Sequence, residues 1–551
     1  MSKEIKKIIK RSSIIRGLFD YVKYNYWIRR NRKIFANILK PVTPKYSGRI
    51  IFLTVRTLVA SPITYLDAFI AHGFKKLGFE VDMLVCDNVL SSCDADTYFD
   101  VKHRAELCSR CRKFRSKLID SLNLNYRSFK EYISCEKIVK IKEDIYSKSP
   151  NDLVNTTLYG VKVAEHARSS TVRYFLIDHV DLNKEDHKKV FLQKLLDAII
   201  VVEVANAVFE KYGKEIKHAI TVHGVYSTWG PFYDYFKMKG IDTLIYSKGT
   251  IRYQSVSFLR YGREWETFYP ETWKSLQKRP LAEEEEKKLE TYIDGRFKKK
   301  MGADLQLYED FSKGSHSDEL RKINAYNYKY RYIIFTHLVW DSCLENQSPA
   351  FSDSVEMLDM TIEYFLKHKD KQLIIKIHPA EIVWEEGSSS MIQHISQKYP
   401  NFTENIVVLP PNTKVSPYEV VNDKTVGITY IGTVGYELSA LGVPVIIGGH
   451  IHYNAEGGLG CLVKSKQEYI GYLEDPSSLF PIAKSKIEQA KKWCYYFAYL
   501  VNFDFPIYSK TVWAAIDWSS LKNINAWLDD DGSSIMRVCN KIAKHEDVVD
   551  Q

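Results

Sequence analysis

An apolar run rich in β-branched residues, followed by a helix and a second such run, constrains this chain most. Residues 49–55 read RIIFLTV and residues 80–86 read EVDMLVC. A helical stretch from Tyr65 to Leu77 separates the two runs, and Gly78 ends it. Continuous apolar strands are typical of parallel sheets, whose two faces are both covered by helices. The spacing therefore predicts a βαβ unit, the start of a doubly wound α/β sheet.

A second and more complete α/β series begins near residue 331. The residue pattern predicts five strands there, at 331–336, 373–377, 405–409, 426–430 and 444–447, and two helices, at 356–367 and 433–441. In the first half, the pattern predicts further strands at 219–222 and 243–246 and the inner part of a helix at 198–205. The polar, charged segment 280–325 is typical of a helical linker.

The 551 residues accordingly divide into four predicted parts. These are a basic amphipathic arm at 1–46, a Rossmann-like domain at 47–300, a second Rossmann-like domain at 301–480 and C-terminal helices at 481–551. The expected fold class is α/β, with two doubly wound domains facing a cleft.

The net charge of +10 is concentrated in the arm, where thirteen Lys/Arg accompany two Asp/Glu. The remaining 65 Lys/Arg and 66 Asp/Glu balance, so the body does not resemble a nucleic-acid-binding protein. The arm fits either an anionic membrane surface or packing on its own protein. Since no stretch of ~18 apolar residues and no signal peptide is seen, we expect a cytoplasmic protein, at most peripheral to the inner face of the membrane.

Histidines follow two predicted strands of the second series. His337 follows strand 331–336, and His378-Pro379 follows strand 373–377, with Glu381 close behind. Ligands of α/β sheets bind at the carboxyl ends of the strands, so these residues are candidates for contacting a nucleotide. A single histidine in such a place is more often structural, but several polar strand ends in one sheet point to a shared site.

The strand at 426–430 leads into the sequence GTVGYE at 432–437, where a helix is predicted to begin at or near Thr433. Free N–H groups at that helix start, near Thr433 and Gly435, would favour a phosphate. Thr433 is also expected to cap the helix. Glu437, one turn further on, is a candidate for binding ribose hydroxyls. The alternative is a plain strand–turn–helix with a surface glutamate.

In the first half, the sequence HGVYSTWGP at 223–231 follows a predicted strand and is expected to face the other domain. A transfer to a hydroxyl acceptor needs one general base. The candidates are Asp67, Asp87, Glu165 and His223, and the sequence does not choose among them.

Four cysteines of the first half lie within residues 86–111. The candidates for a structural zinc site are Cys86, Cys93, Cys108 and Cys111. Only the last two have the common C-x2-C spacing, and buried free thiols are the alternative interpretation.

Taken together, FTHLVWDS at 335–342, KIHPAE at 376–381 and YIGTVGYELSALGVPVIIGG at 430–449 resemble the capsular polysaccharide biosynthesis family, which includes bacterial Kdo transferases. The resemblance is specific over about 330–455 and looser over 50–260. It implies a GT-B fold, a nucleotide-sugar donor in the C-terminal domain, most simply CMP- or UDP-linked, and a polysaccharide or lipid-linked acceptor in the N-terminal domain. It also implies metal-independent transfer, with His378-Pro379 and Thr433 contacting the donor nucleotide.

Three rival functions remain open. A teichoic-acid-type transferase would move a phospho-alditol from a CDP donor and form a phosphodiester. A non-catalytic partner in polysaccharide assembly or export would bind no nucleotide. A sugar-nucleotide epimerase would need carboxylates around the donor sugar, and the sequence identifies none.

Overall fold

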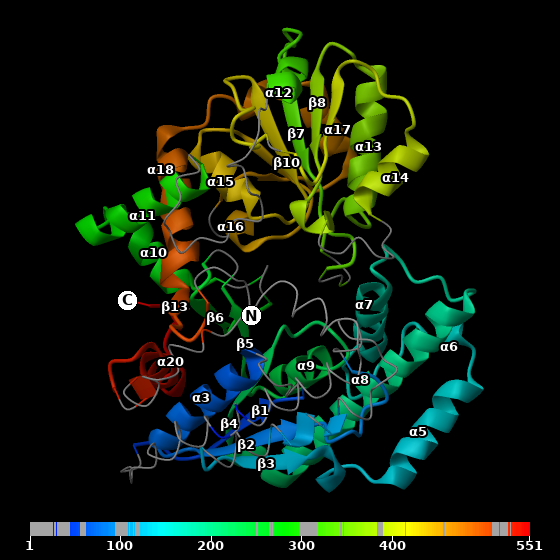
Figure 1. Ribbon diagram of the computed structural model, residues 1–551, viewed down its shortest axis with the longest axis vertical. Coiled ribbons are helices and arrows are strands. Elements are labelled where there is room, and N and C mark those ends of the chain that lie inside the picture. Colours follow the sequence, from blue (N-terminus) through cyan, green and yellow to red (C-terminus); the bar gives the residue numbers. More distant parts are fainter. Residues whose placement is uncertain are drawn as a thin grey trace.

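The computed structural model describes residues 45–550, with its longer gaps at 56–61, 94–107, 116–121, 298–316, 383–389 and within 510–526. The basic arm at 1–46 therefore lies almost entirely outside the described residues. Two α/β domains stack along the long axis of the molecule (Figure 1). The expected α/β fold with two doubly wound sheets is confirmed.

The N-terminal domain is built on a seven-stranded mixed sheet in the order β13-β6-β5-β4-β1-β2-β3. Its central strands pair in parallel and follow the strand order 3-2-1-4-5 of a Rossmann domain. The strands are β1 (Arg49–Leu53), β2 (Glu80–Val85), β3 (Asn125–Ser128), β4 (Ile216–Val222), β5 (Asp242–Lys248), β6 (Ser255–Leu259) and β13 (Asn502–Asp504). β1 is buried almost throughout, which explains its continuous apolar sequence.

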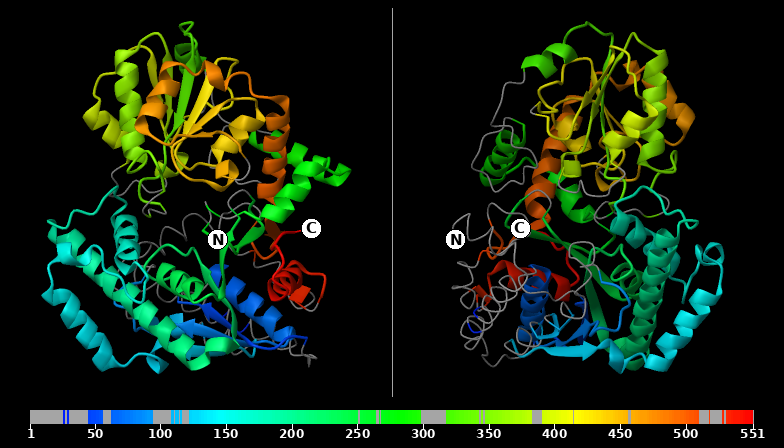
Figure 2. Two further views of the ribbon diagram at one scale, coloured as in Figure 1. Left: turned by 180° about the vertical axis from the view of Figure 1, so that it is seen from behind. Right: turned by 45° about the vertical axis from the view of Figure 1, so that its right-hand side comes forward.

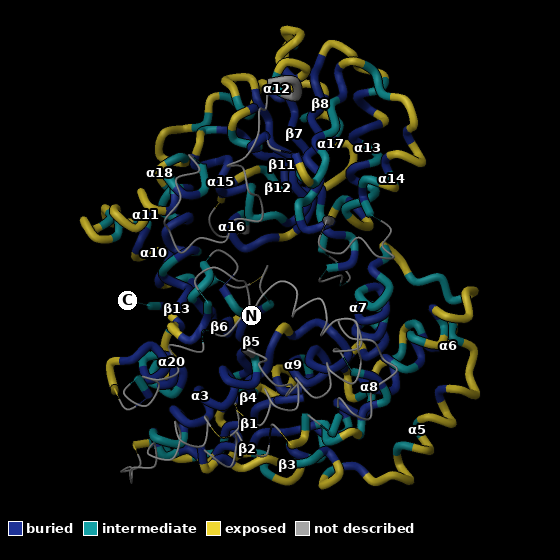
Figure 3. The backbone as a smooth tube through the Cα atoms, in the orientation of Figure 1, coloured by how far each residue is buried: buried dark blue, intermediate teal, exposed yellow. Residues whose placement is uncertain are grey.

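Helices cover this sheet and extend the domain (Figure 2). They are α3 (Pro62–Lys76), α5 (Cys135–Ser147), α6 (Pro150–Leu153), α7 (Val163–Phe175), α8 (Glu185–Tyr212) and α9 (Gly230–Met238). α3 contributes a run of fully buried side chains to the core, whereas α5 has a largely exposed surface (Figure 3).

The C-terminal domain contains a six-stranded sheet, all parallel, in the order β12-β11-β10-β7-β8-β9. This is the full Rossmann order, with its topological switch point between β7 and β10. The strands are β7 (Arg331–Phe335), β8 (Gln372–Lys376), β9 (Ile406–Leu409), β10 (Thr425–Thr429), β11 (Val445–Ile447) and β12 (Cys461–Leu462). The helices are α12 (Ser317–Ile323), α13 (Ser354–Lys367), α14 (Met391–Lys398), α15 (Val434–Ala440), α16 (His452–Ala455) and α17 (Lys466–Glu474).

The last part of the chain returns to the first domain. α18 (Lys484–Tyr495) packs on α15 and on the linker helices α10 (Pro270–Lys278) and α11 (Glu283–Arg296). β13 then joins the first sheet antiparallel to β6, and α20 (Ser534–Ala543) packs on α3. The tail at 481–551, predicted as C-terminal helices, contains the helices α18 and α20 and, in addition, strand β13. Two Rossmann-like domains joined by such a returning tail form the GT-B layout.

Candidate functional site

The loops at the two topological switch points meet across the domain boundary. The Tyr226 hydroxyl, in the loop after β4, donates a hydrogen bond of 3.1 Å to Asp341 Oδ1, in the loop after β7. The switch point of the N-terminal sheet lies between β1 and β4, and that of the C-terminal sheet between β7 and β10. Ligands bind at such points in open α/β sheets. This contact therefore marks the candidate active site.

Helix α7 of the N-terminal domain makes further contacts, apolar and cation–π, with the C-terminal domain at the same place. Val172 of α7 and Leu176, the residue after that helix, form a buried cluster with Leu338, Trp340 and Ala380 of the C-terminal domain. The Arg173 guanidinium lies 4.2 Å from the centre of the Trp340 ring. α7 thus contacts both the loop that carries His337 and the loop that carries His378.

His378 lies directly after β8 and is fixed by two backbone contacts. Its N–H donates to Thr336 Oγ1 at 3.0 Å, and Ala380 N–H donates to His378 Nδ1 at 3.1 Å. Because Nδ1 accepts, a neutral ring carries its proton on Nε2. Burial, with smaller effects of His337 and Lys376, lowers the pKa of His378 to about 4. The residue is therefore a neutral hydrogen-bond donor at pH 7.

His337 follows β7 and lies next to this group. Its Nε2 is buried and has no hydrogen-bond partner within the described part of the chain. Burial lowers the pKa of the ring, and Asp341 opposes that effect. A buried polar atom without a partner is uncommon in folded proteins and is suited to a ligand contact.

Lys376 is a buried cation of this site and was not among the residues predicted from the sequence. It is the last residue of β8 and is 3% exposed. Its Nζ donates to the Ile377 carbonyl at 3.1 Å, and its charge acts on His378. The sequence could have predicted this role, because a lysine two residues before a histidine at a strand end can approach the same ligand.

The predicted helix start after β10 is present but differs in detail. α15 begins at Val434, and the Thr433 side chain makes no capping hydrogen bond. The expectation that Thr433 caps this helix is therefore wrong, because its backbone is already helical. A Cβ on Gly435 would lie 2.0 Å from Tyr453 Oη, so close packing of Tyr453 accounts for this glycine.

Glu437 is not a surface residue. Both oxygens of its fully buried carboxylate are engaged, by the hydroxyls of Tyr292 and Tyr418 and by Arg296, whose Nε lies at 2.9 Å. The carboxylate thereby fastens the linker helix α11 to α15. Glu381 is likewise internal, since its Oε1 accepts from Met391 N–H at 3.0 Å at the start of α14.

Among the candidate bases, His223 is the exposed one. It follows β4 in a left-handed conformation (φ 61°), with its ring centre 6.2 Å from that of Tyr226. His166 holds this loop from behind: its Nε2 lies 2.8 Å from Asp234 Oδ2, and its Nδ1 contacts Val225 O at 2.5 Å. His166 was not predicted from the sequence, because nothing local distinguishes it from other helix residues.

The other candidate bases have different surroundings. Asp67 of α3 is buried and accepts from the Tyr246 hydroxyl at 2.5 Å. Burial raises its pKa to about 7, against the effect of that hydrogen bond. Glu165, in the first turn of α7, lies 4.0 Å from Lys162 Nζ. Asp87 pairs with Arg115 at 3.4 Å.

The four cysteines proposed as zinc ligands do not form a group. All four belong to the described residues. Among those residues, the group that brings three potential ligand atoms close enough to share one ion contains none of these cysteines. Cys86 Sγ accepts from Leu90 N–H at 3.5 Å, and burial raises the pKa of this thiol to about 11.

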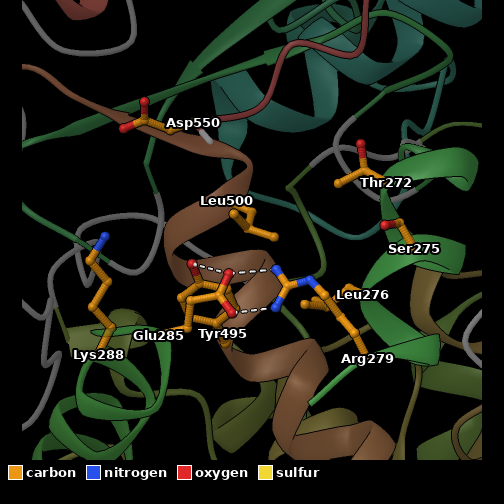
Figure 4. Close-up of a pocket in the computed structure, with 9 residues that line it drawn as sticks. All are labelled: Thr272, Ser275, Leu276, Arg279, Glu285, Lys288, Tyr495, Leu500 and Asp550. Atoms are coloured by element: carbon orange, nitrogen blue, oxygen red, sulfur yellow. Dashed lines mark hydrogen bonds and ion pairs between the residues drawn. The ribbon is translucent and has the colours of Figure 1, made fainter. Parts of the chain in front are cut away.

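A cavity of about 410 Å³ lies elsewhere, where α10, α11 and α18 meet (Figure 4). Arg279 and Glu285 pair across it, with Nη2 and Oε1 2.6 Å apart, and the Tyr495 hydroxyl also donates to Glu285. Opposite charges balance each other there, so this cavity is not selective for a phosphate.

No family model matches the sequence, and no curated protein matches it significantly. The resemblance to the capsular polysaccharide family is thus not confirmed by a family match. No helix among the described residues is long and apolar enough to cross a membrane.

Solved structures with some similarity include UDP-N-acetylglucosamine 2-epimerases and glycosyltransferases. The Neisseria meningitidis UDP-GlcNAc 2-epimerase bound to UDP-GlcNAc shows 9% identity and a TM-score of 0.27, over 81% of this chain and 98% of its own. The spinosyn rhamnosyltransferase SpnG shows 11% identity and a TM-score of 0.26, over 81% of this chain and 95% of its own. The glycosyltransferase SnogD from Streptomyces nogalater shows 11% identity and a TM-score of 0.23, over 81% of this chain and 95% of its own. TM-scores this low do not establish a shared fold, so the fold is assigned from the strand order of the two sheets.

Proposed function

We propose that this protein is a glycosyltransferase that moves a sugar from a nucleotide-sugar donor to a growing surface polysaccharide. The observation that carries the proposal is the Tyr226–Asp341 hydrogen bond. It brings the loop with the exposed His223 against the loop with His337, beside His378. A donor group and a candidate base therefore lie on opposite sides of one domain boundary, as transfer between two substrates requires.

The donor side has the groups that a departing nucleotide phosphate needs. Negative charge grows on that phosphate as the glycosidic bond breaks, and preorganised donors stabilise it. Lys376 supplies a positive charge, while His378 and His337 supply ring nitrogens. Thr433 is a further candidate, since its hydroxyl does not cap α15.

On the acceptor side, His223 is our choice of general base. It is exposed next to the domain contact, whereas Asp67 is buried against Tyr246 and Glu165 lies in the first turn of α7. A base takes the proton of the acceptor hydroxyl as that oxygen attacks the sugar. Asp67 remains the second candidate, because a pKa of about 7 suits a base at neutral pH.

The proposed nucleotide of the donor and the proposed acceptor follow from the sequence resemblance. We expect a CMP- or UDP-linked sugar, no required cofactor or metal, and a polysaccharide or lipid-linked acceptor at the inner face of the membrane. The basic arm at 1–46, with thirteen Lys/Arg, would favour an anionic lipid surface.

Nucleotide binding is the first test. Thermal unfolding would be followed with CMP, CDP, UDP and GDP and their sugars, for the wild type, His378→Ala and the control His368→Ala. A ligand at ~100 times its Kd stabilises by ~2.7 kcal/mol. His368 is an exposed histidine of the same domain at the end of α13 and stacks on Tyr364. One nucleotide should stabilise the wild type and the control but not His378→Ala.

The product decides between the rival functions. A glycosidic product, identified by mass spectrometry, supports the proposal, whereas a phosphodiester product indicates an alditol-phosphate transferase. An epimerised sugar nucleotide indicates an epimerase. If no nucleotide shifts the unfolding of a folded wild type, the proposal is wrong and a non-catalytic assembly partner becomes the better interpretation.

A further inference from the structure

The end of the chain docks on the first sheet, at the edge opposite the candidate active site. Asp242 is the first residue of β5, and its neighbour in the sheet register is His218, near the start of β4. α20 packs on α3 nearby, and His545 follows that helix (Figure 1). Residues more than 300 positions apart in the sequence thus meet at the amino ends of two central strands.

We propose that His218, Asp242 and His545 bind a divalent transition-metal ion such as Zn²⁺. Asp242 Oδ2 lies 2.9 Å from His218 Nδ1 and 3.2 Å from His545 Nδ1, and the three ligand atoms lie within 4.8 Å of one another. Zinc bonds of ~2.0–2.1 Å in a tetrahedron place neighbouring ligand atoms ~3.3 Å apart. Small movements of the side chains would therefore accommodate the ion.

The type of ligand also points to a transition metal. Two imidazoles and one carboxylate suit Zn²⁺, Co²⁺ or Ni²⁺, whereas Mg²⁺ and Ca²⁺ prefer oxygen ligands. His545 is exposed, so a water molecule can complete the coordination. The other metal-ligating residues that the sequence suggested, the four cysteines, are not grouped in this way.

Arg260 orients the carboxylate. Its Nε lies 3.1 Å from Asp242 Oδ1, and its other nitrogens donate to the carbonyls of Ile542 and Glu546. The guanidinium therefore holds Oδ1 and leaves Oδ2 between the two imidazoles, as outer partners of metal ligands commonly do. Its positive charge opposes that of the ion, so we expect micromolar rather than nanomolar affinity.

The turn after α20 places His545. Its backbone is left-handed (φ 56°), and Glu546 N–H donates to Lys541 O at 2.9 Å, which closes the helix end. This turn directs the ring toward the sheet, where its centre lies 4.9 Å from that of His218. A bound ion would fasten the last residues of the chain to the first sheet, and this role does not depend on the proposed function.

The test is metal binding to the full chain after removal of metal with EDTA. Zn²⁺ would be titrated by calorimetry, and Co²⁺ by its visible absorption, into the wild type and His545→Ala. His179→Ala is the matched control, because His179 is an exposed histidine whose Nδ1 lies 2.9 Å from a single aspartate, Asp178. We expect one equivalent to bind the wild type and the control, with affinity at least tenfold lower in His545→Ala.

Two results of the metal titrations would overturn the proposal. One is a folded wild type that binds neither ion at 100 µM, on the order of tenfold above the expected Kd, where binding should be near saturation. The other is unchanged affinity in His545→Ala, which would place the ion elsewhere. A loss of thermal stability in His545→Ala that is the same with and without Zn²⁺ also contradicts the proposal, since it indicates a hydrogen-bonded triad alone.

Discussion

Replacing Glu437 by glutamine should destabilise the C-terminal domain strongly. The carboxylate is fully buried and is bonded by Tyr292, Tyr418 and Arg296, whose Nε and Nη2 lie 2.9 and 3.2 Å away. Burial alone would lower the pKa of the Arg296 guanidinium, but Glu437 raises that pKa well above its ordinary value. Glutamine keeps the shape of the side chain and removes the charge that compensates the guanidinium.

Breaking a buried ion pair from one side costs ~3–5 kcal/mol. For a unit of 150–250 residues, 1 kcal/mol corresponds to ~2–4 °C in Tm, so the expected loss is about 6–20 °C. Differential scanning calorimetry would measure the transition of the C-terminal domain in Glu437→Gln, Arg296→Met and the double variant. The double variant should recover much of the loss, because replacing both partners leaves no unpaired charge.

An exposed glutamate provides the control. Glu488 pairs with Lys491 at the surface, and Glu488→Gln should change stability by no more than ~0.5 kcal/mol. The reasoning is refuted if Glu437→Gln unfolds at the wild-type temperature. If that variant is stable but has lost affinity for the nucleotide, Glu437 contacts the ribose, as the sequence alone suggested.

Three other substitutions test the remaining features. Tyr226→Phe removes the hydrogen bond to Asp341. If that bond supports the catalytic arrangement, its loss should raise the activation free energy by ~0.5–1.5 kcal/mol, which lowers kcat by about 2- to 12-fold. Nucleotide affinity, measured by calorimetry, should not change. Equal kcat would show that the contact does not support catalysis. Gly435→Ala drives a Cβ into Tyr453 and should cost ~1–3 kcal/mol in thermal unfolding, so an unchanged Tm would contradict the packing argument. Burial lowers the pKa of His452 to about 3, so protons bind preferentially to the unfolded chain below its ordinary pKa of ~6.5 and stability falls from pH 6.5 toward pH 3. His452→Leu should make Tm less dependent on pH in that range, and an identical pH profile would rule out this contribution.

Local sequence was sufficient to predict most of the regular structure. The apolar run at 49–55 became β1, and the expected strands at 331–336 and 373–377 became β7 and β8. These strands are buried on both faces, so each needs an apolar sequence that is visible without knowledge of its partners. β13 was missed because its three residues pair with β6, about 250 positions earlier in the chain.

The candidate site was predictable to a similar extent. The sequence places His337 and His378 at strand ends, and parallel strands bring such ends to one edge. It does not show that Tyr226 meets Asp341, because that contact depends on how two separately folded sheets stack. It also does not show the triad of His218, Asp242 and His545, which assembles only when the tail returns to the first sheet.

Glu437 shows most clearly where sequence reasoning ends. By itself the sequence determined that this glutamate lies one turn into a helix after a buried strand, a place suited equally to a ligand and to a structural partner. Only the tertiary structure shows which groups surround the carboxylate, because α11 packs on α15 and brings Tyr292 and Arg296 to it. Hydrophobic periodicity and turn residues act over a few positions and can therefore be recognised in the local sequence. The partners of a buried charge, in contrast, are set by the packing of elements that are distant in the sequence.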